Sequence, residues 1–467
     1  MYKVLLLACY ELGHQPLSLA WPAAFLRQDG RQVTVCDLAV SSLDEEAVLG
    51  AVGEADFVGV AVPMHTAMRL GVQAAKQVRT LNPEAHVCFF GLYAMLNAGY
   101  LQHAENGQRP LADSVIAGEY EEPLRKLVAA LAAGRKAEDV PGVSTPGREE
   151  EAYLQRLRFP VPDRHGLPAL SNYAHYMYDG TAVPAGYVEA SRGCLHTCRH
   201  CPVVPVYGGR FFVTPLETVM ADVRQQVAAG ARHITFGDPD FLNGPGHALK
   251  VAQALHDEFP DVTFDFTTKV EHILERRQLF GSLHQAGARF VVSAFESTSD
   301  FVLERLQKGH TLADMDEALR ILNEADLHVQ PTWLPFTPWT TLDDYLHMLR
   351  WIRQRKLISH VPLVQLSIRL LVPPRSALLD HADVSQWLGP LDQENFTYRW
   401  RHPDPRMDEL QREVAALAEV KGGGDAYAGF AAVERAAYEV AGREAPTWTA
   451  PAIPDLPPPR LTEDWFC

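Results

Sequence analysis

The 467-residue sequence contains no apolar run long enough to cross a bilayer and no excess of positive charge. A membrane-spanning helix needs about 20 consecutive apolar residues, and Met1-Tyr2-Lys3 leads directly into an apolar strand pattern instead of a signal peptide. Proteins that bind nucleic acid nonspecifically neutralise its phosphates with basic side chains, whereas this chain carries a net charge of −16. We therefore expect neither a membrane partner nor a nucleic-acid partner.

The sequence also lacks a disulfide framework, because its cysteines are few and unevenly spaced. Three of them cluster within eight residues, three stand singly near apolar runs, and one is the last residue given. The three single cysteines are expected to be small buried hydrophobes. Such cysteine usage fits a reducing compartment, so we expect the protein to be cytoplasmic. The seven cysteines are Cys9, Cys36, Cys88, Cys194, Cys198, Cys201 and Cys467.

Apolar runs alternate with helical patterns over residues 1–140. With 47% hydrophobic and 21% charged residues, the composition is that of a globular protein large enough for two or three domains. The alternation predicts an open, doubly wound α/β sheet of the Rossmann type, in which ligands bind outside the carboxyl ends of the strands. The expected strands are 4–8, 33–36, 58–62, 87–90 and 115–117, and the expected helices include 68–80 and 121–133.

A second α/β region follows a linker at residues 141–185, which contains scattered Pro and Gly. Six strand–helix units over residues 186–385 predict a partial (β/α)6 barrel of the TIM type, with its chemistry at the carboxyl ends of the strands. The first barrel helix is expected to begin with Pro215 after a capping box formed by Thr214 and Glu217. Residues 386–467 are expected to form a small helical region with a proline-rich tail. The expected barrel strands are 187–191, 233–236, 263–267, 290–293, 329–333 and 364–370.

Cys194, Cys198 and Cys201 form a C-x3-C-x2-C motif directly after the first expected barrel strand. Cysteine thiolates are the usual ligands of iron–sulfur clusters, and a cubane normally takes four of them. Three thiolates would leave one iron without a protein ligand and therefore open to another molecule. The alternative is a structural zinc site that His196 or His200 completes.

This motif, placed after the first strand of an α/β barrel, resembles the signature of the radical S-adenosylmethionine (SAM) superfamily. The resemblance implies a 4Fe–4S cluster whose open iron binds SAM and whose electron cleaves SAM to a 5′-deoxyadenosyl radical. It also implies an external electron donor such as a flavodoxin or a ferredoxin, and a barrel that orients the cofactors. The family often has an aromatic residue just before the third cysteine, where this chain has His200.

Polar residues at the carboxyl ends of the expected barrel strands resemble the SAM-binding positions of this family. Residues 237–240 resemble the turn that holds the amino group of SAM, and residues 294–297 resemble a segment that contacts its carboxylate or ribose. A cation suits a carboxylate, so Lys269 and Arg369 are expected carboxylate partners. The alternative for each is an exposed charge at a strand end. The SAM-binding candidates are Gly237, Asp238, Asp240, Lys269, Ser293, Glu296 and Arg369.

Residues 1–140 resemble the cobalamin-binding domain that precedes many radical SAM barrels. The resemblance is carried by the turn at 118–121, Gly-Glu-Tyr-Glu, and by the loop at 91–94, Gly-Leu-Tyr-Ala. The first loop lacks D-x-H-x-x-G, the motif whose histidine ligates cobalt in some cobalamin proteins, which leaves His14 or His65 as substitutes. The alternative is a Rossmann-like fold without the cofactor. The cobalamin-binding candidates are Pro63, Met64, His65, Gly91, Gly118 and Glu119.

The segment Leu461-Thr462-Glu463-Asp464-Trp465-Phe466-Cys467 has a narrower resemblance. Together with segments 201–207, 235–241, 336–341 and 400–406, it resembles the radical SAM proteins named for a CUAEP or CCAEP tail, in which selenocysteine or cysteine follows this cysteine. We hypothesise that a UGA selenocysteine codon follows the codon of Cys467, and any other codon there would remove the idea. The alternative is an ordinary exposed cysteine. The resemblance makes Cys467 a candidate redox residue or a soft ligand for arsenic or selenium.

Taken together, the motifs and resemblances predict a radical SAM enzyme that transfers a methyl group to a small-molecule substrate with the help of cobalamin. Two alternatives remain open. The first is transfer of the aminocarboxypropyl fragment of SAM to a soft atom such as arsenic or selenium. The second is a non-catalytic iron–sulfur protein that senses SAM. The sequence does not identify the substrate.

Overall fold

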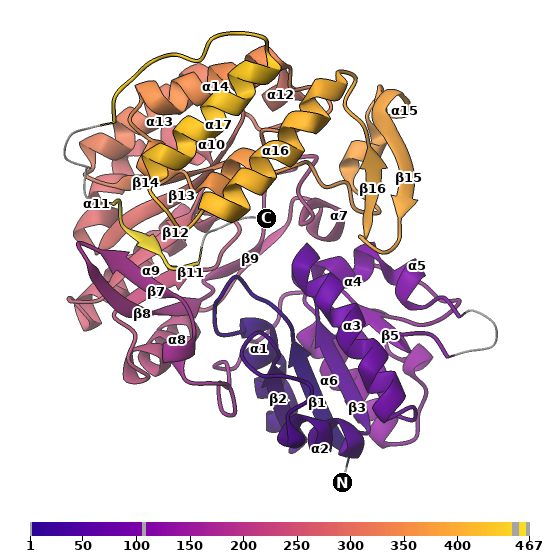
Figure 1. Ribbon diagram of the computed structural model, residues 1–467. Helices are drawn as coiled ribbons and strands as arrows, with labels where there is room; N and C mark the ends of the chain where they lie inside the picture. The colour runs from indigo at the N-terminus through magenta and orange to yellow at the C-terminus, as the bar shows by residue number, and fades with distance from the viewer. Residues whose placement is uncertain (1, 105–108, 451–456, 464–467) are drawn as a thin grey trace.

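The computed structural model describes residues 2–104, 109–450 and 457–463. In Figure 1 the N-terminal sheet and its helices lie below a larger barrel, and the last helices of the chain pack on the barrel's outer side. The predicted redox residue or soft ligand, Cys467, lies outside the described residues. Within the described residues, no helix is both long enough and apolar enough to span a membrane.

The N-terminal sheet has the order β2-β1-β3-β4-β5-β6, in which only β6 is antiparallel. Helices α1 and α6 pack on one face of the sheet, and α2 and α3 pack on the other. The expected doubly wound sheet is therefore confirmed. Its strands are β1 (Lys3–Ala8), β2 (Gln32–Asp37), β3 (Phe57–Ala61), β4 (His86–Phe90), β5 (Ser114–Ile116) and β6 (Val143–Ser144). Its helices are α1 (Leu17–Gln28), α2 (Glu46–Glu54), α3 (His65–Leu81), α4 (Leu92–Leu96), α5 (Ala98–Leu101) and α6 (Glu121–Ala132).

The barrel contains five parallel strands in the order β14-β13-β12-β11-β8, and two short antiparallel strands, β7 and β17, extend it beyond β8. The strand β17 belongs to the C-terminal segment, and Gln330 on β14 donates to the carbonyl of Pro459 just before it. The C-terminal segment therefore bridges the two edges of the barrel sheet. The strands are β7 (His175–Tyr178), β8 (Thr181–Val188), β11 (His233–Phe236), β12 (Thr263–Thr267), β13 (Ala288–Glu296), β14 (His328–Trp333) and β17 (Arg460–Leu461).

Helices surround the barrel strands and bury its main apolar core against them. The partial barrel expected from the sequence is confirmed in its five parallel strands. The helices of this region are α7 (Val204–Tyr207), α8 (Leu216–Ala228), α9 (Pro245–Glu258), α10 (Val270–Glu275), α11 (Phe280–Gln285), α12 (Asp300–Arg305), α13 (Leu312–Glu324) and α14 (Leu342–Gln354).

The sixth barrel strand, expected at 364–370, is wrong as a regular strand. Residues Leu363–Ser367 form a 3₁₀ helix, and a single parallel bridge between Phe336 and Arg369 is what remains of the strand pairing. The side chain of Gln365 accepts a hydrogen bond from the backbone N–H of Trp333. In a regular sheet, a backbone carbonyl of the neighbouring strand would accept this hydrogen bond. Periodicity in the sequence does not reveal such a substitution.

The capping box expected at the start of α8 is also wrong. The helix begins at Leu216 with Pro215 as its N-cap, and no side chain caps it. The backbone N–H of Thr214 donates to the carbonyl of Ala190 at 2.9 Å, which ties Thr214 to the barrel, and its buried hydroxyl has no partner in the described residues.

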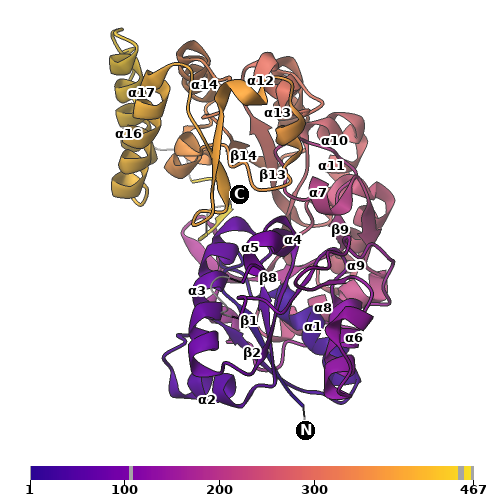
Figure 2. The ribbon, with the colours of Figure 1, turned by 90° about the vertical axis from the view of Figure 1, so that its right-hand side faces the viewer.

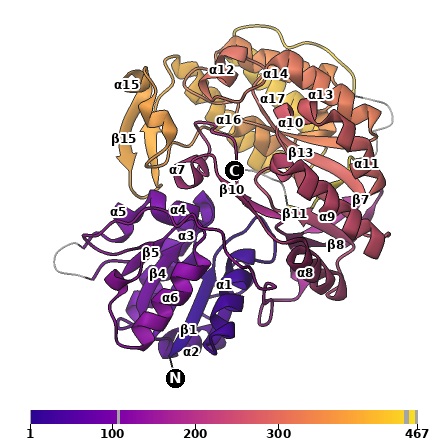
Figure 3. The same cartoon turned by 180° about the vertical axis from the view of Figure 1, so that it is seen from behind.

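The C-terminal region consists of a β-hairpin followed by a pair of helices. The hairpin strands β15 (Leu388–Asp392) and β16 (Thr397–Trp400) follow the short helix α15 (Val384–Trp387). In Figures 1 and 3 the hairpin reaches from the barrel to the N-terminal sheet beside α5. Its tip residue Phe396 is buried in the core of that sheet, 5.2 Å from the ring of Tyr100. Figure 2 shows α16 (Pro405–Lys421) and α17 (Ala426–Val440) as an outer pair beside α14.

Candidate functional site

A cavity of about 570 Å³ lies where the carboxyl ends of the barrel strands face those of the N-terminal sheet. Loops from both halves of the chain line this cavity, which we call the shared cavity. It therefore brings together most of the residues that the sequence singled out. These are Cys194, Cys198 and Cys201; Gly237, Asp240, Lys269, Glu296 and Arg369; and Pro63, Met64, His65, Gly91 and Gly118.

The loop with the three cysteines enters the shared cavity from the short strand β9 (Ser191–Gly193), which pairs with β10 (Phe211–Val213). Gly193 has φ +71°, and a Cβ atom there would lie 2.4 Å from the carbonyl oxygen of Arg210, so only glycine fits this turn. The backbone N–H of Cys194 donates to the same carbonyl, and that of Arg199 donates to Leu306. Both ends of the loop are therefore fixed to the barrel.

The spacing of the three cysteine sulfurs argues against the zinc alternative. Among the described residues, only the ligand atoms of His196, Asp240 and His272 form a group of three within 4.8 Å of one another, so the cysteine sulfurs are spread more widely. A single zinc ion with bonds of about 2.3 Å would hold sulfurs about 3.8 Å apart. Burial raises the pKa of the Cys201 thiol to about 12, so a bound metal is needed to keep this sulfur as a thiolate at neutral pH.

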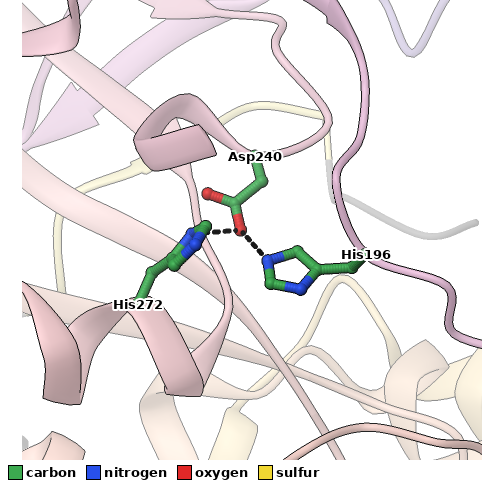
Figure 4. Close-up of side chains that lie close together, drawn as sticks. All are labelled: His196, Asp240 and His272. Atoms are coloured by element: carbon green, nitrogen blue, oxygen red, sulfur yellow. Dashed lines mark hydrogen bonds and ion pairs between the residues drawn. The ribbon is translucent and has the colours of Figure 1, made fainter. Parts of the chain in front are cut away.

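The two histidines of the cysteine loop contact carboxylates instead of the sulfurs. His196 Nε2 lies 3.5 Å from Asp240 Oδ2 (Figure 4), and His200 Nε2 lies 3.3 Å from Glu296 Oε1. Lys269 Nζ donates to His196 Nδ1 at 3.1 Å, which leaves the proton of the neutral ring on Nε2. Neither ring is therefore placed to complete a zinc site with the cysteines.

The carboxylate of Asp240 accepts four hydrogen bonds within the protein, two on each oxygen. Its Oδ1 accepts from Leu242 N and Thr268 Oγ1, and its Oδ2 accepts from Lys269 N and His272 Nδ1, with His272 on α10 at 2.9 Å. Burial alone would raise the pKa of Asp240, but the hydrogen bonds from His196 and His272 hold it below its ordinary value. Asp240 therefore joins the cysteine loop to the ends of β11 and β12 (Figure 4) and has little capacity left for an ammonium group of SAM.

Three predicted site residues do not line the shared cavity. Ser293 lies on β13 between two residues that line the cavity, and alternate side chains of a strand point in opposite directions. Asp238 follows β11 and also lies between two residues that line the cavity. Asp238 instead accepts from Ser191 Oγ at 2.5 Å and from the N–H of Ala190, whereas Ser293 Oγ is buried without a partner in the described residues. Glu119 accepts from Tyr207 Oη at 3.0 Å and is likewise buried. The side chains of these three residues are thus directed away from the cavity, and their contacts with cofactors stay a prediction.

Glu296 and Lys308 form a buried ion pair beside the cysteine loop. Lys308 Nζ donates to Glu296 Oε1 at 3.1 Å, and both side chains line the shared cavity. Burial would raise the pKa of Glu296, but Lys308 and His200 outweigh it and lower the pKa. Lys308 carries no recognisable signal in the sequence, because it lies in a loop after α12 and not at the end of a strand. It places a positive charge close to Cys198 and Cys201.

Arg369 lines the shared cavity, but its charge already has a partner. Its Nη1 donates to Asp408 on α16 at 2.6 Å, and its guanidinium stacks 3.6 Å from the ring centroid of Trp400. Lys269 is also engaged, with Nζ donating to Glu271 at 2.9 Å, although Glu271 remains one-third exposed. Because its acidic partner is partly exposed and Arg369 is held by both Asp408 and Trp400, Lys269 is the better placed of the two to bind the carboxylate of SAM.

Arg192, which was not among the residues predicted from the sequence, links the two halves of the chain just before Cys194. Its Nη1 donates to Glu121 at 2.5 Å and its Nε donates to Glu189 at 3.0 Å, while Glu119 lies 4.0 Å away. Burial raises the pKa of Glu119 and of Glu121, and Arg192 partly opposes this effect. The carboxylates of the turn at 118–121 therefore hold the start of the cysteine loop through their contacts with Arg192.

The loops at the carboxyl ends of β3 and β4 form the opposite wall of the shared cavity. Gly91 has φ +110° and lies at the start of α4, where a Cβ atom would come within 3.1 Å of the backbone of Val62. His65, the first residue of α3, donates from Nε2 to the backbone carbonyl of Asn395 at 2.7 Å. This wall is thus joined to the β15–β16 hairpin.

Comparison with known proteins identifies the barrel. Residues 188–352 match the family model described as the Radical SAM superfamily. The chain is 24% identical over 339 residues to an uncharacterized methyltransferase of Pyrococcus horikoshii, covering 70% of this chain and 71% of that protein. It is 25% identical over 330 residues to the hopanoid C-3 methylase of Methylococcus capsulatus, covering 70% of this chain and 62% of the methylase.

Two solved structures share the fold. The cobalamin-dependent SAM radical enzyme OxsB, with aqua-cobalamin and SAM bound, has a TM-score of 0.70 and 14% identity over 88% of this chain and 66% of its own. The radical SAM methyltransferase TsrM from Kitasatospora setae, with tryptophan and a SAM analog bound, has a TM-score of 0.60 and 18% identity over 76% of this chain and 72% of its own. At such low identity these likenesses concern the fold alone.

Proposed function

We propose that this chain, whose barrel is a radical SAM domain, catalyses the transfer of a methyl group from SAM to a small-molecule substrate with the assistance of cobalamin. The match over residues 188–352 confirms the superfamily that the cysteine motif indicated, and with it a 4Fe–4S cluster and SAM as cofactors of an enzyme. The methyl transfer, the cobalamin, the substrate class and the external reductant are our proposals. For the reductant we propose a flavodoxin or a ferredoxin. For the compartment we propose the cytoplasm, because the cysteines of the described chain are free.

One observation carries the proposal: the cysteine loop and the strand-end loops of the N-terminal sheet line the same cavity. Ligands of open α/β sheets bind outside the carboxyl ends of the strands, and the chemistry of a barrel takes place at the same ends of its own strands. Two cofactors bound to the two halves would therefore meet in one enclosed space. A sensor that only binds SAM would have no need of such a second wall.

The residues present fit these groups. Cys194, Cys198 and Cys201 would hold the cluster, and Lys269 would bind the carboxylate of SAM. The loops at 63–66 and 91–94 would hold the corrin ring against the apolar side of the cavity. When bound, the cluster supplies one electron that cleaves SAM, and cobalamin carries a methyl group to the substrate.

The side chains of this protein then bind, orient and exclude water. Asp240 and His272 fix His196, and through it the cysteine loop, to the barrel strands. Lys308 offsets part of the negative charge of the thiolates in a site with little water. Apolar residues such as Leu92 and Val203 line the rest of the shared cavity and keep solvent from a reactive radical. The relatives named as methylases or methyltransferases support the transfer of a methyl group.

An anaerobic activity assay tests the proposal. The protein is reconstituted with iron and sulfide, loaded with hydroxocobalamin and incubated with SAM and dithionite. We expect formation of 5′-deoxyadenosine and S-adenosylhomocysteine, and no such products from Cys198→Ala. Cys88→Ala is the matched control, because Cys88 is a buried cysteine of the N-terminal sheet. Methylthioadenosine as the product would favour transfer of the aminocarboxypropyl fragment, and an intact cluster that never cleaves SAM would favour a sensor.

A further inference from the structure

His65 occupies a distinctive position in the shared cavity. It follows the carboxyl end of β3 as the first residue of α3, and it lines the cavity next to Pro63 and Met64. We propose that the Nδ1 atom of His65 is an axial ligand of the cobalt of the bound cobalamin. This inference is built on the proposed function, because it concerns the same cavity and names the residue that contacts the metal.

The hydrogen bond of His65 assigns its tautomer. A backbone carbonyl can only accept, so Nε2 must carry the proton that it shares with the carbonyl oxygen of Asn395 at 2.7 Å. In a neutral ring with Nε2 protonated, the lone pair is on Nδ1, and no described residue forms a hydrogen bond with that atom. Histidines that bind metals usually donate their other ring N–H to a carbonyl or carboxylate in this way.

The carbonyl that orients the ring is itself held firmly. The side chain and backbone N–H of Asn395 both donate to Asp392, and the next residue, Phe396, is buried in the N-terminal core. The ring of Tyr93 contacts the ring of His65 edge-on, with centroids 5.9 Å apart. The His65 ring is thus fixed before any metal binds, which reduces the entropy that coordination would cost.

The other histidine considered from the sequence, His14, cannot take this role. Its ring stacks on that of Tyr187 with centroids 4.3 Å apart, and it lines a separate small cavity instead of the shared one. The ring is buried, and its pKa is lowered by burial to about 3. His14 is therefore a neutral packing residue and provides a matched control.

Electron paramagnetic resonance of the protein with bound cob(II)alamin tests the assignment. The lone pair of Nδ1 forms a coordinate bond to Co(II), no electron is transferred, and the unpaired electron on cobalt couples to the axial nitrogen. We expect a nitrogen triplet on the cobalt lines of the wild-type protein, which becomes a doublet when the protein is labelled with ¹⁵N-histidine and the cobalamin is not. We expect His65→Gln to lose the splitting and His14→Gln to keep it. Should His65→Gln fold poorly, His65→Ala supplied with ¹⁵N-imidazole should restore a doublet.

The outcomes separate this inference from the proposed function. A triplet that persists after ¹⁵N-histidine labelling would come from the cobalamin's own base and would overturn the role of His65. Bound cobalamin without nitrogen splitting, or a splitting that survives His65→Gln, would overturn it as well, and in each case the proposed methyl transfer would stand. A protein that does not bind cobalamin would overturn both.

Discussion

Replacing Arg192 with methionine should destabilise the whole chain, because it removes the only cation from a group of three carboxylates in the described structure, two of which are buried. Glu121 is fully buried, and losing the partner of a buried charge costs about 3–5 kcal/mol. Arg192 also lies 4.8 Å from the ring centroid of Phe159, and a desolvated cation–π contact contributes about 2 kcal/mol. We therefore expect a loss of about 5–7 kcal/mol in the free energy of unfolding at pH 7.

Urea unfolding of the cluster-free protein, followed by tryptophan fluorescence, measures this loss. The double variant Arg192→Met/Glu121→Gln removes the cation together with its nearest carboxylate, so it should be less destabilised than the sum of the single variants by about 1–3 kcal/mol. Arg224→Met is the control, because Arg224 pairs with Glu258 on the surface and should hardly change the midpoint. Additive single variants, or an Arg192→Met midpoint no lower than that of Arg224→Met, would refute the reasoning.

Three further predictions concern the cluster and the pH. Lys308→Met should make the cluster harder to reduce, since it removes a buried positive charge near two cluster cysteines, and a redox titration followed by electron paramagnetic resonance would show a more negative midpoint potential. Cys198→Ser should lower bound iron and sulfide to background in metal and sulfide analysis, and retention of a full cluster would contradict the assignment. Burial raises the pKa of Glu11 to about 8 and that of Asp238 to about 7, so the folded state holds protons that the unfolded state releases above its ordinary carboxyl pKa. The contribution of each group to stability should therefore fall as the pH rises toward its raised pKa, by about 4–5 kcal/mol in all. Glu11→Gln keeps the neutral form, so its urea midpoint relative to the wild type should rise between about pH 4.5 and 8, and a constant difference would contradict the raised pKa of Glu11.

Continuous apolar runs made the parallel strands predictable from the sequence. Runs such as 4–8 and 58–62 are buried on both faces, so their pattern directly reflects their environment. The apolar pattern at 364–370 also predicted a strand, but the structure has a 3₁₀ helix there. The hydrogen bond between Gln365 and Trp333 depends on a contact between segments far apart in the chain, which the pattern does not contain. The C-x3-C-x2-C motif was recognisable because all three cluster ligands lie within eight consecutive residues.

The candidate site was harder to predict where a side chain acts through a distant partner. Strand ends indicated Gly237, Lys269 and Glu296 correctly as residues of the cavity wall. They did not distinguish Asp238, whose carboxylate accepts hydrogen bonds from Ser191 and Ala190 and does not line the cavity. Arg192 was not singled out either, because two of its three carboxylate partners, Glu119 and Glu121, come from a turn more than seventy residues earlier in the chain.

The insertion of Phe396 into the N-terminal core has a consequence for the kinetics of ligand exchange. The two halves of the chain cannot separate at the hairpin without exposing this ring and breaking the contact between His65 and Asn395. Those two losses amount to about 3–4 kcal/mol, which corresponds to a slowing of roughly a hundredfold or more. A bulky molecule enclosed between the halves would consequently have a long residence time, and its entry would be easiest while the chain is still folding.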